Sequence, residues 1–218
     1  MTMNAMKWTI RVASWGVLVT AILFLGIGYV HSRREKPSLP APTTLPLLGN
    51  VPAFTLTAHT GQPLTLDDLR GKIWIANFFF TSCQSICPIM QDNMVEVQKA
   101  FASNPAVQIV SFTVDPERDT AAVLSDYAQR KGAIPGKWLF VTGAKKAIYR
   151  LARQGFKLAA DDIPEQLQGT KHDFIHSEKF VLVDAQGHIR GYYSGLDIEQ
   201  VHRLIEDTHA LLREEGMQ

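Results

Sequence analysis

The sequence has very little cysteine and almost no excess of charge. Only two of its 218 residues are cysteine, Cys83 and Cys87. Two cysteines cannot build a scaffold of several disulfides, but they can form one disulfide, one dithiol or half of a metal site. A net charge of +1 argues against a nucleic-acid-binding protein, because such proteins usually carry a strong basic excess. A hydrophobic share of 46% excludes a wholly disordered chain.

Charge is completely missing from residues 12–30, an apolar run near the amino terminus. Its length is close to the ~20 residues that span a bilayer as a helix. A cleaved signal peptide has a shorter apolar region and a small-residue cleavage site, whereas this run is followed by His31-Ser32-Arg33-Arg34. The sequence therefore predicts a short amino-terminal tail at 1–11 and an uncleaved transmembrane anchor at 12–30. Basic residues flank both ends of the run, so the charge pattern does not decide its orientation.

Residues 31–50 connect this anchor to the rest of the chain. The part from 37 to 50 contains four prolines and no charged residue. Such composition is typical of a semi-rigid, extended linker. We therefore expect a proline-rich tether at 31–50 and a soluble domain at 51–218.

The soluble domain alternates between strand and helix patterns. The continuous apolar run at 73–80, IWIANFFF, is typical of a central strand buried on both faces. Further strands are expected at 53–56, 63–66, 107–114, 138–141, 179–184 and 189–194, and helices at about 88–101, 120–131, 144–154 and 198–214. A strand-helix-strand opening that is followed by a hairpin and a last helix fits an α/β thioredoxin-like sandwich, a central mixed sheet flanked by helices. Residues 155–175 form a long connection without clear periodicity, which is usually functional or mobile.

The two cysteines lie where the strand at 73–80 ends and the next helix begins, in Cys83-Gln84-Ser85-Ile86-Cys87-Pro88. Proline is tolerated in a first helical turn. Amide groups and the dipole at a helix amino terminus stabilise thiolates, so we expect both thiols to ionise more easily than a free cysteine. The spacing of four should bring both sulfurs to one side, close enough for a disulfide or a shared metal.

The spacing favours metal binding over dithiol redox chemistry, although two buried structural cysteines remain an alternative. Dithiol oxidoreductases of this fold favour two residues between the cysteines, and here there are three. Thiolates select copper(I) or zinc. A zinc site with four thiolates is impossible with two cysteines. Copper(I) accepts two or three soft ligands, so two thiolates and one imidazole would be sufficient.

His172 and His176 precede the strand at 179–184. In a thioredoxin-like sheet this strand neighbours the strand that leads to the cysteines. Thiol oxidoreductases of this fold place a cis-proline just before it, and this sequence has none there. His176 is the favoured third ligand and His172 the weaker candidate. Asp115, after the strand at 107–114, is expected to shape a turn in which Asp119 or Thr120 caps the next helix, with support of the metal ligands as the alternative.

Three separated segments now resemble one known family. TSCQSICPIM at 81–90, VDPERDT at 114–120 and FIHSEKFVLVDAQGHIRGYYSG at 174–195 together resemble the Sco family, also called SenC, of copper chaperones. The stretch FTLTAHTGQPLTLDDLRGKIWIANFFFTSC fits as well, and the resemblance covers residues 51–214. It implies a thioredoxin-like domain that binds copper through Cys83, Cys87 and His176. Many members have Asp before the motif histidine, and this sequence has Ile175, so one partner for the imidazole is missing.

The resemblance also implies a role and a place in the cell. Members serve assembly of the dinuclear copper centre of cytochrome c oxidase, as copper donor, thiol reductase or both. The implied partners are the copper-bearing oxidase subunit, a copper donor protein, a thiol reductant and the membrane, but no nucleic acid. The implied location is the bacterial inner membrane, as a single-pass protein with its domain in the periplasm.

The leading interpretation is an assembly factor and not an enzyme in the strict sense. The alternative is a thiol-disulfide oxidoreductase that keeps oxidase cysteines reduced. A peroxidase of the same fold would need a Pro-Thr-type loop around its cysteine, which this sequence does not have.

Overall fold

The computed structural model describes residues 44–158 and 177–217. The described residues belong to one compact unit. Within the described ranges, no helix is both long enough and apolar enough to cross a membrane. The predicted anchor at 12–30 lies outside these ranges, so it stays a prediction.

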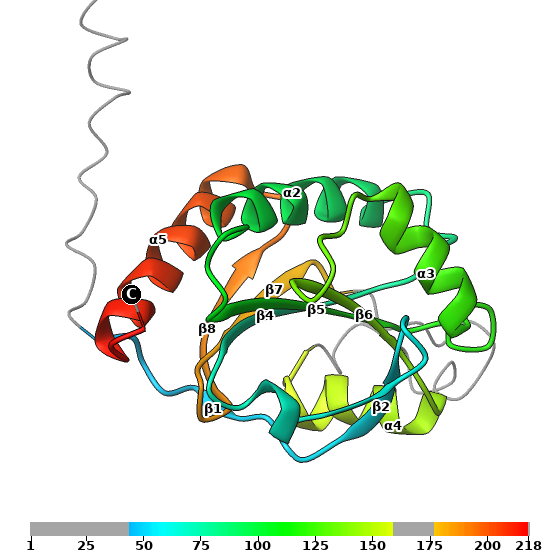
Figure 1. Cartoon of the computed structure of the whole chain (residues 1–218), viewed down its shortest axis with the longest axis horizontal. Coiled ribbons are helices and arrows are strands. Elements are labelled where there is room, and N and C mark those ends of the chain that lie inside the picture. The colour runs from blue at the N-terminus through cyan, green and yellow to red at the C-terminus, as the bar shows by residue number, and fades with distance from the viewer. Residues whose placement is uncertain (1–43, 159–176, 218) are drawn as a thin grey trace, which may run out of the picture. The chain divides into compact units, whose positions relative to one another are not determined.

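The described strands form one mixed sheet in the order β1-β8-β7-β4-β5-β6-β2-β3, drawn in Figure 1. The strands are β1 (Gly49–Asn50), β2 (Thr55–Ala58), β3 (Pro63–Thr65), β4 (Ile73–Phe79), β5 (Val107–Thr113), β6 (Trp138–Thr142), β7 (Lys179–Val183) and β8 (His188–Ser194). The helices are α2 (Cys87–Ala100), α3 (Ala121–Arg130), α4 (Lys145–Arg150) and α5 (Ile198–Glu214), with a 3-10 turn η1 (Asp67–Leu69) and a π-helical turn η2 (Leu151–Gly155) that continues α4.

The centre of the sheet decides where the functional loops lie. Strands β4, β5 and β6 are parallel neighbours, and β7 pairs with β4 in the antiparallel direction. The carboxyl ends of β4, β5 and β6 therefore meet along one edge, which we call the carboxyl edge. Loops that leave this edge lie close together, as in other open α/β sheets, where ligands bind beyond the carboxyl ends of the strands.

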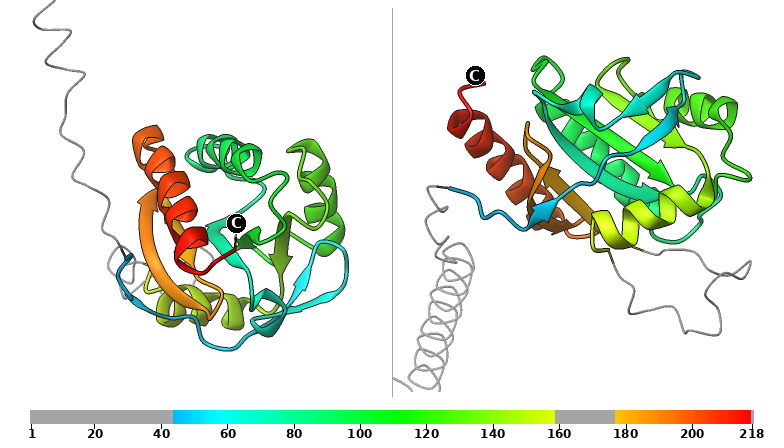
Figure 2. Two further views of the ribbon diagram at one scale, coloured as in Figure 1. Left: turned by 60° about the vertical axis from the view of Figure 1, so that its left-hand side comes forward. Right: turned by 90° about the horizontal axis from the view of Figure 1, so that it is seen from below.

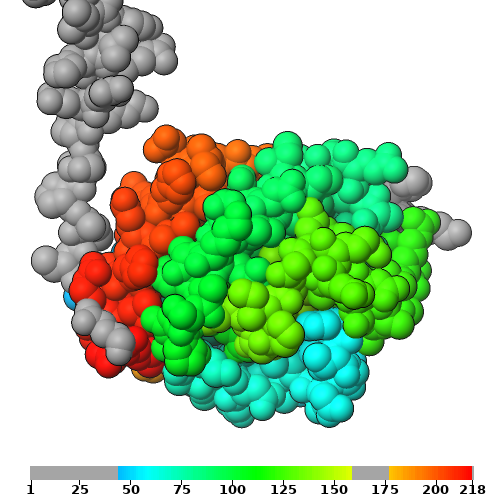
Figure 3. Space-filling view, turned by 45° about the horizontal axis from the view of Figure 1, so that its top comes forward, coloured from blue at the N-terminus to red at the C-terminus, as the bar shows by residue number. Residues whose placement is uncertain are grey.

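Strand β4 lies between two hydrophobic cores and contributes side chains to both, as its continuous apolar run predicted. All seven of its residues are buried. Ile73, Ile75 and Phe79 belong to the core that α2, α3 and α5 cover. Trp74 and Phe78 belong to the opposite core, beneath α4 and η2. Figures 1 and 2 show these two helical layers on the two faces of the sheet, and Figure 3 shows α5, α2 and α3 side by side on the first face.

The predicted order of strands and helices is confirmed, with differences of a few residues at the ends. The arrangement of β4, α2 and β5, followed by the hairpin β7–β8 and the helix α5, is that of a thioredoxin-like sandwich. Three features were not predicted. They are β1, which is only two residues long, the 3-10 turn η1, and the change from α-helix to π-helix after Arg150.

The folded domain begins earlier than the sequence indicated. Residues 44–50 were assigned to the tether, but Leu45 is buried and Gly49 pairs with Ile189 at the edge of the sheet. The Leu48 N–H also donates to the Ile189 carbonyl at 2.8 Å. A strand of two residues is too short for a period-two pattern, so the prolines dominated the prediction.

A buried arginine holds this early segment in place. Arg190 on β8 is only 6% exposed and donates to three elements at once. It binds Asp184 Oδ2 at 3.2 Å, the Leu45 carbonyl at 2.8 Å and Glu214 Oε1 at 2.7 Å. Burial alone would lower the pKa of Arg190, but its hydrogen bonds with Glu214 and Asp184 raise it instead. The network joins the chain entry, the β7–β8 hairpin and the end of α5.

Replacing Arg190 with Met should therefore destabilise the domain strongly. The substitution leaves the Asp184 carboxylate, which is 1% exposed, without its buried cation. Removing one partner of a buried ion pair costs about 3–5 kcal/mol, so urea unfolding at neutral pH should show a loss of that size. Arg213→Met, on the exposed side of α5, is the control and should change the free energy of unfolding by less than about 0.5 kcal/mol. Equal stability of the two variants would contradict the importance of this network.

Candidate metal and thiol site

The two cysteines lie on the carboxyl edge. The chain leaves β4 at Phe79, forms a loop at 81–86 that we call the cysteine loop, and enters α2 at Cys87. The Cys83 N–H donates to the Phe80 carbonyl at 3.3 Å, which turns the chain directly after the strand. Pro88 occupies the first turn of α2, as the sequence predicted. The loop therefore has a fixed start on a buried strand and a fixed end on a long helix.

The structure brings the two sulfurs together as free thiols. Cys83 is half-buried, while Cys87, the first residue of α2, is 5% exposed and belongs to the core that α2 covers. The two thiols lie near enough that each changes the pKa of the other. The Ser85 hydroxyl lies 3.6 Å from the Cys83 sulfur. The prediction that this spacing brings both sulfurs to one side is confirmed.

The two thiols differ sharply in acidity. Burial and the hydrogen bond with Cys83 raise the pKa of Cys87 to about 12. Partial burial on its own would raise the pKa of Cys83, but hydrogen bonds from Cys87 and Ser85 outweigh it and lower that pKa. The prediction of easy ionisation is confirmed for Cys83 and wrong for Cys87. The reason is that Cys87 lies in the core, where its proton is held between the two sulfurs and a second negative charge is disfavoured.

A buried carboxylate that the sequence did not assign to the site fixes the cysteine loop. Asp119 is 1% exposed and lies after β5, next to the loop. It accepts hydrogen bonds from the Thr81 N–H at 3.0 Å and from the hydroxyls of Thr81 and Thr113. The helix cap that the sequence left open between two residues belongs to Thr120, whose hydroxyl accepts from the Val123 N–H. Asp119 is therefore available to join the start of the cysteine loop to the end of β5.

Asp119 also acts on the buried thiol through its charge. Its carboxylate is one of the negative groups that raise the pKa of Cys87. The carboxylate thus positions the loop through Thr81 and disfavours ionisation of Cys87 in the metal-free protein. Asp119 follows a predicted strand and precedes the helix cap, while Thr113 ends β5 and Thr81 follows shortly after β4. That pattern was the available signal, but it fits simple capping equally well.

Asp115 has the turn role that the sequence favoured. Its carbonyl accepts from the N–H groups of Arg118 and Asp119, and its own N–H donates to the Thr113 hydroxyl. The carboxylate lies 3.7 Å from the Arg118 guanidinium. Burial and the negative charge of Asp119 raise the pKa of Asp115. Among the described residues, its side chain makes no hydrogen bond or ion pair with either thiol. Support of the metal ligands by Asp115 stays a prediction, because His176 lies outside the described residues.

Strand β7 begins at the carboxyl end of β4, the end from which the cysteine loop leaves. It pairs with β4, with Ala76 opposite Val181, so the beginning of β7 lies at the carboxyl end of β4. The Gly195 N–H donates to the Glu178 carbonyl at 2.7 Å, and Asn93 on α2 donates to the Gly195 carbonyl at 2.8 Å. These bonds tie the start of β7 to the cysteine helix. A side chain at Gly195 would come within 2.6 Å of Phe180, so the close approach requires glycine.

His172 and His176 themselves lie outside the described residues. Ser177 is the first residue described after them. Within 44–158 and 177–217, no group of three His, Cys, Asp or Glu side chains could hold a metal ion. The described part of the site is therefore the thiol pair, with the loop that carries it and the start of β7 beside it.

A thiol pair at the strand-to-helix junction of a thioredoxin-like domain defines a thiol-based metal or redox protein. A family model described as SCO1/SenC matches residues 48–213. This match covers most of the chain, and the chain belongs to the SCO1/SenC family.

The curated relatives cover most of the chain as well. A SCO1 protein homolog of Bacillus subtilis is 34% identical over 165 residues, which are 75% of this chain and 83% of that protein. A putative copper-binding protein of Stutzerimonas stutzeri is 29% identical over 68% of this chain and 71% of its own length.

Solved structures share the fold. A SCO1/SenC family lipoprotein from Bacillus anthracis is 34% identical over 76% of this chain and 96% of that one, with a TM-score of 0.66. BsSco, a Sco family cytochrome c oxidase assembly protein with a disulfide switch, is 32% identical, with a TM-score of 0.64, over 77% of this chain and 96% of that one.

The difference between the thiols predicts an order of chemical modification. In the reduced, metal-free protein at about pH 7.5, iodoacetamide should modify Cys83 at least about tenfold faster than Cys87, because Cys83 has the lowered pKa and the greater exposure. Peptide mass spectrometry of briefly treated samples measures the order. Cys87→Ser removes the thiol that donates to Cys83 and serves as the comparison, in which Cys83 should react more slowly. Faster modification of Cys87 in the parent protein would contradict the site as described.

Proposed function

We propose that this protein is a membrane-anchored copper protein that delivers copper to, or matures, the dinuclear copper centre of cytochrome c oxidase. The observation that carries the proposal is the pair of free thiols in contact at the carboxyl end of β4. Membership of the SCO1/SenC family and the names of its relatives, a putative copper-binding protein and an oxidase assembly protein, support it.

The donor set fits copper(I). Two adjacent thiols provide soft ligands, and a metal ion would take the place of the proton that they share. We propose His176 as the third ligand because it directly precedes Ser177, just before the strand that pairs with β4. Copper is the cargo in this reading, and three ligands leave room for a ligand from a partner to enter.

The unequal burial of the thiols suits transfer. Cys87 is part of the core and stays in place, whereas Cys83 lies on a loop with access to solvent. A partner's ligand can therefore approach from the side of Cys83 while Cys87 still holds the cargo. Asp119 keeps the loop at the edge of the sheet throughout, through Thr81. Oxidation to a Cys83–Cys87 disulfide would remove both thiolates and with them the copper site.

The membrane anchor is part of the same proposal. Residues 12–30 would hold the protein in the bacterial inner membrane as a single-pass protein, with a shortened tether and the domain in the periplasm. A copper donor protein and a thiol reductant would then act on the domain from the same compartment.

One observation favours a second function, a thiol-disulfide oxidoreductase that keeps oxidase cysteines reduced. A half-buried thiol of lowered pKa beside a buried thiol of raised pKa is the arrangement in which the first attacks a disulfide and the second resolves it. In the first step the Cys83 thiolate bonds to one sulfur of the partner's disulfide, whose S–S bond breaks and releases the other sulfur as a thiolate that can take up the Cys87 proton. In the second step the Cys87 thiolate bonds to Cys83, the mixed disulfide breaks, and the partner leaves as a dithiol after its second sulfur takes up a proton from solvent. The same residues thus support both functions, and only the third ligand separates them.

Replacing His176 with Ala should weaken copper(I) binding by more than about 100-fold, since loss of a ligand exceeds the 10–100-fold effect of residues that only support ligands. Competition with a copper(I) chelator on the reduced protein measures the affinity. The thiol pair should still cycle between dithiol and disulfide, because thiol exchange does not require this imidazole. His172→Ala is the matched control and should keep the parental affinity.

Oxidase assembly in cells then separates the two functions. Under the copper proposal, a His176→Ala strain should lack the dinuclear copper centre even though the thiol pair cycles normally. Normal assembly in that strain would contradict copper delivery and leave thiol reduction as the function. A melting temperature close to that of the parent protein is required for both readouts, and far-ultraviolet circular dichroism checks it.

A further inference from the structure

The segment that follows β6 is strongly basic in an otherwise acidic domain. Residues 143–158, GAKKAIYRLARQGFKL, contain five Lys or Arg residues and no Asp or Glu. The rest of the chain from 37 to 218 contains 12 basic and 20 acidic residues. Charge of one sign gathered on a single element produces a local potential that the net charge hides.

The fold holds these cations on a rigid support. Tyr149 of α4 is buried, and its hydroxyl donates to the Val114 carbonyl at the end of β5. Its ring lies between Lys145, whose Nζ is 5.5 Å from the ring centroid, and Arg153, whose guanidinium carbon is 5.6 Å away. Lys146 and Arg150 are exposed. Neither of these two makes an ion pair with any residue in the described part of the chain.

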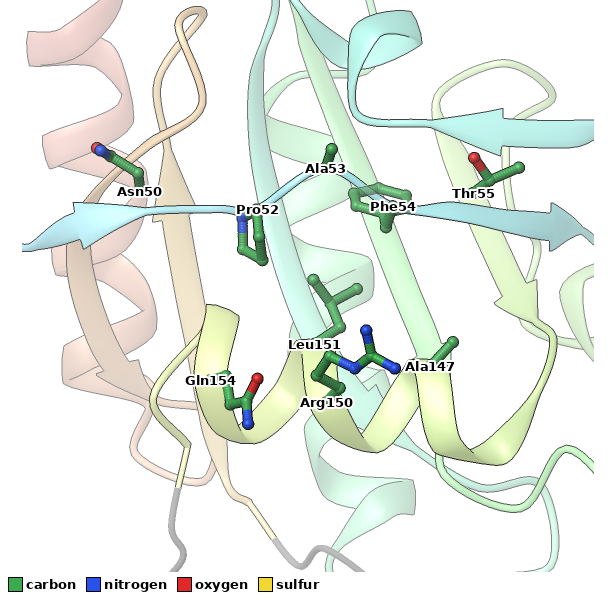
Figure 4. Close-up of a pocket in the computed structure, with 9 residues that line it drawn as sticks. All are labelled: Asn50, Pro52, Ala53, Phe54, Thr55, Ala147, Arg150, Leu151 and Gln154. Carbon is green, nitrogen blue, oxygen red and sulfur yellow. The ribbon is translucent and has the colours of Figure 1, made fainter.

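Two hollows meet along this helix. One is lined by Lys145, Lys146, Arg150 and Arg153 together with Glu117 and Tyr149. The other lies between α4 and residues 50–55 and has apolar walls that include Pro52, Phe54 and Leu151. Arg150 and Gln154 line both hollows. In Figure 4, the Arg150 guanidinium points from α4 toward the segment that carries Phe54.

This basic surface begins beside the candidate site. The cysteine loop follows β4, residues 115–120 follow β5, and the start of α4 follows β6, so all three segments leave the carboxyl edge. The positive charge of Lys145 acts on the Asp115 carboxylate, and Asp119 acts on Cys87. A molecule seated on α4 would therefore lie next to the edge on which the thiols are displayed.

We propose that the surface formed by Lys145, Lys146, Arg150 and Arg153, with the apolar hollow beside Phe54, binds an acidic surface of the protein that exchanges copper or electrons with the thiol pair. This inference rests on the proposed function. Charge complementarity selects an acidic partner and speeds the encounter, while apolar side chains enter the hollow. A protein fits better than a lipid headgroup because the surface combines cations with an apolar hollow and lies beside the thiols.

The test measures association of the full-length chain, reconstituted in lipid nanodiscs, with the soluble copper-bearing domain of the oxidase subunit. The variant is Lys146→Glu with Arg150→Glu. The matched control is Lys99→Glu with Arg213→Glu, which changes the net charge equally at exposed positions on α2 and α5. Association rates are recorded at about 20 mM and about 200 mM salt, since screening lengths fall across that range. Copper(I) affinity is measured for each protein beforehand.

The proposal predicts that Lys146→Glu/Arg150→Glu lowers the association rate about tenfold at low salt and loses most of the salt dependence. The control should stay within about twofold of the parent, and copper(I) affinity should be the same in all three proteins. Equal rates for variant and parent would overturn the basic surface while leaving copper delivery intact. A parent protein that neither binds this domain nor passes copper to it would overturn the proposed function and the surface together.

The same experiment distinguishes binding of an acidic protein from binding of an anionic membrane by this basic surface. Nanodiscs of neutral lipid and nanodiscs with about 30% anionic lipid are compared, because anionic headgroups attract basic segments. The proposal expects the defect of Lys146→Glu/Arg150→Glu in both lipids. A defect that occurs only with anionic lipid would assign the surface to the membrane and overturn the proposal.

Discussion

The carboxylate of Asp119 holds the site together, because it connects the cysteine loop to the end of strand β5. Its bonds to Thr81 and Thr113 connect the carboxyl ends of β4 and β5, directly before the cysteine loop. Everything on one side of this connection is core, since β4 is buried along its full length. On the other side, the cysteine loop is partly exposed between Thr81 and Ile86. The thiol pair lies on this boundary, with Cys87 in the core and Cys83 outside it.

This boundary explains why one thiol pair can support two functions. Burial in the core raises the pKa of Cys87 and fixes its place. Burial alone would also raise the pKa of Cys83, but hydrogen bonds from Cys87 and Ser85 lower it, and the position on a loop gives this thiol access to solvent. A metal ion needs two converging sulfurs, and disulfide exchange needs one attacking and one resolving sulfur. Both requirements are met by the same geometry. Under the proposed function a third ligand, His176, decides between them, so the His176→Ala variant is the decisive experiment.

Much of the fold could be predicted, because the residues that form the clearest apolar patterns in the sequence also form the buried core. The apolar run at 73–80 became β4, and the helices that followed it appeared where the apolar stripes indicated. The early packing of residues 44–50 could not be predicted. It depends on contacts with β8 and Arg190, which lie about 140 residues away in the chain. Long-range pairing of so short a strand leaves no local pattern to read.

The candidate site likewise has features that the sequence predicts and features that it does not. Convergence of the two cysteines followed from their spacing and their place between strand and helix. The opposite pKa shifts did not, because the helix-dipole argument treats both sulfurs alike, whereas their burial and their hydrogen bonds differ. The sequence indicated Asp119 only as a possible helix cap. Its role in fixing the cysteine loop could not be predicted, because Thr81 and Thr113 approach it only after β4 and β5 pair.

X-ray absorption at the copper edge of the copper(I)-loaded, reduced protein tests the central claim most directly. We expect a single copper per chain with two sulfur ligands and one nitrogen ligand at bonding distance. In the His176→Ala protein the nitrogen should disappear while both sulfurs remain. A copper site without sulfur, or the same nitrogen in parent and variant, would contradict the assignment of Cys83, Cys87 and His176 as the copper ligands.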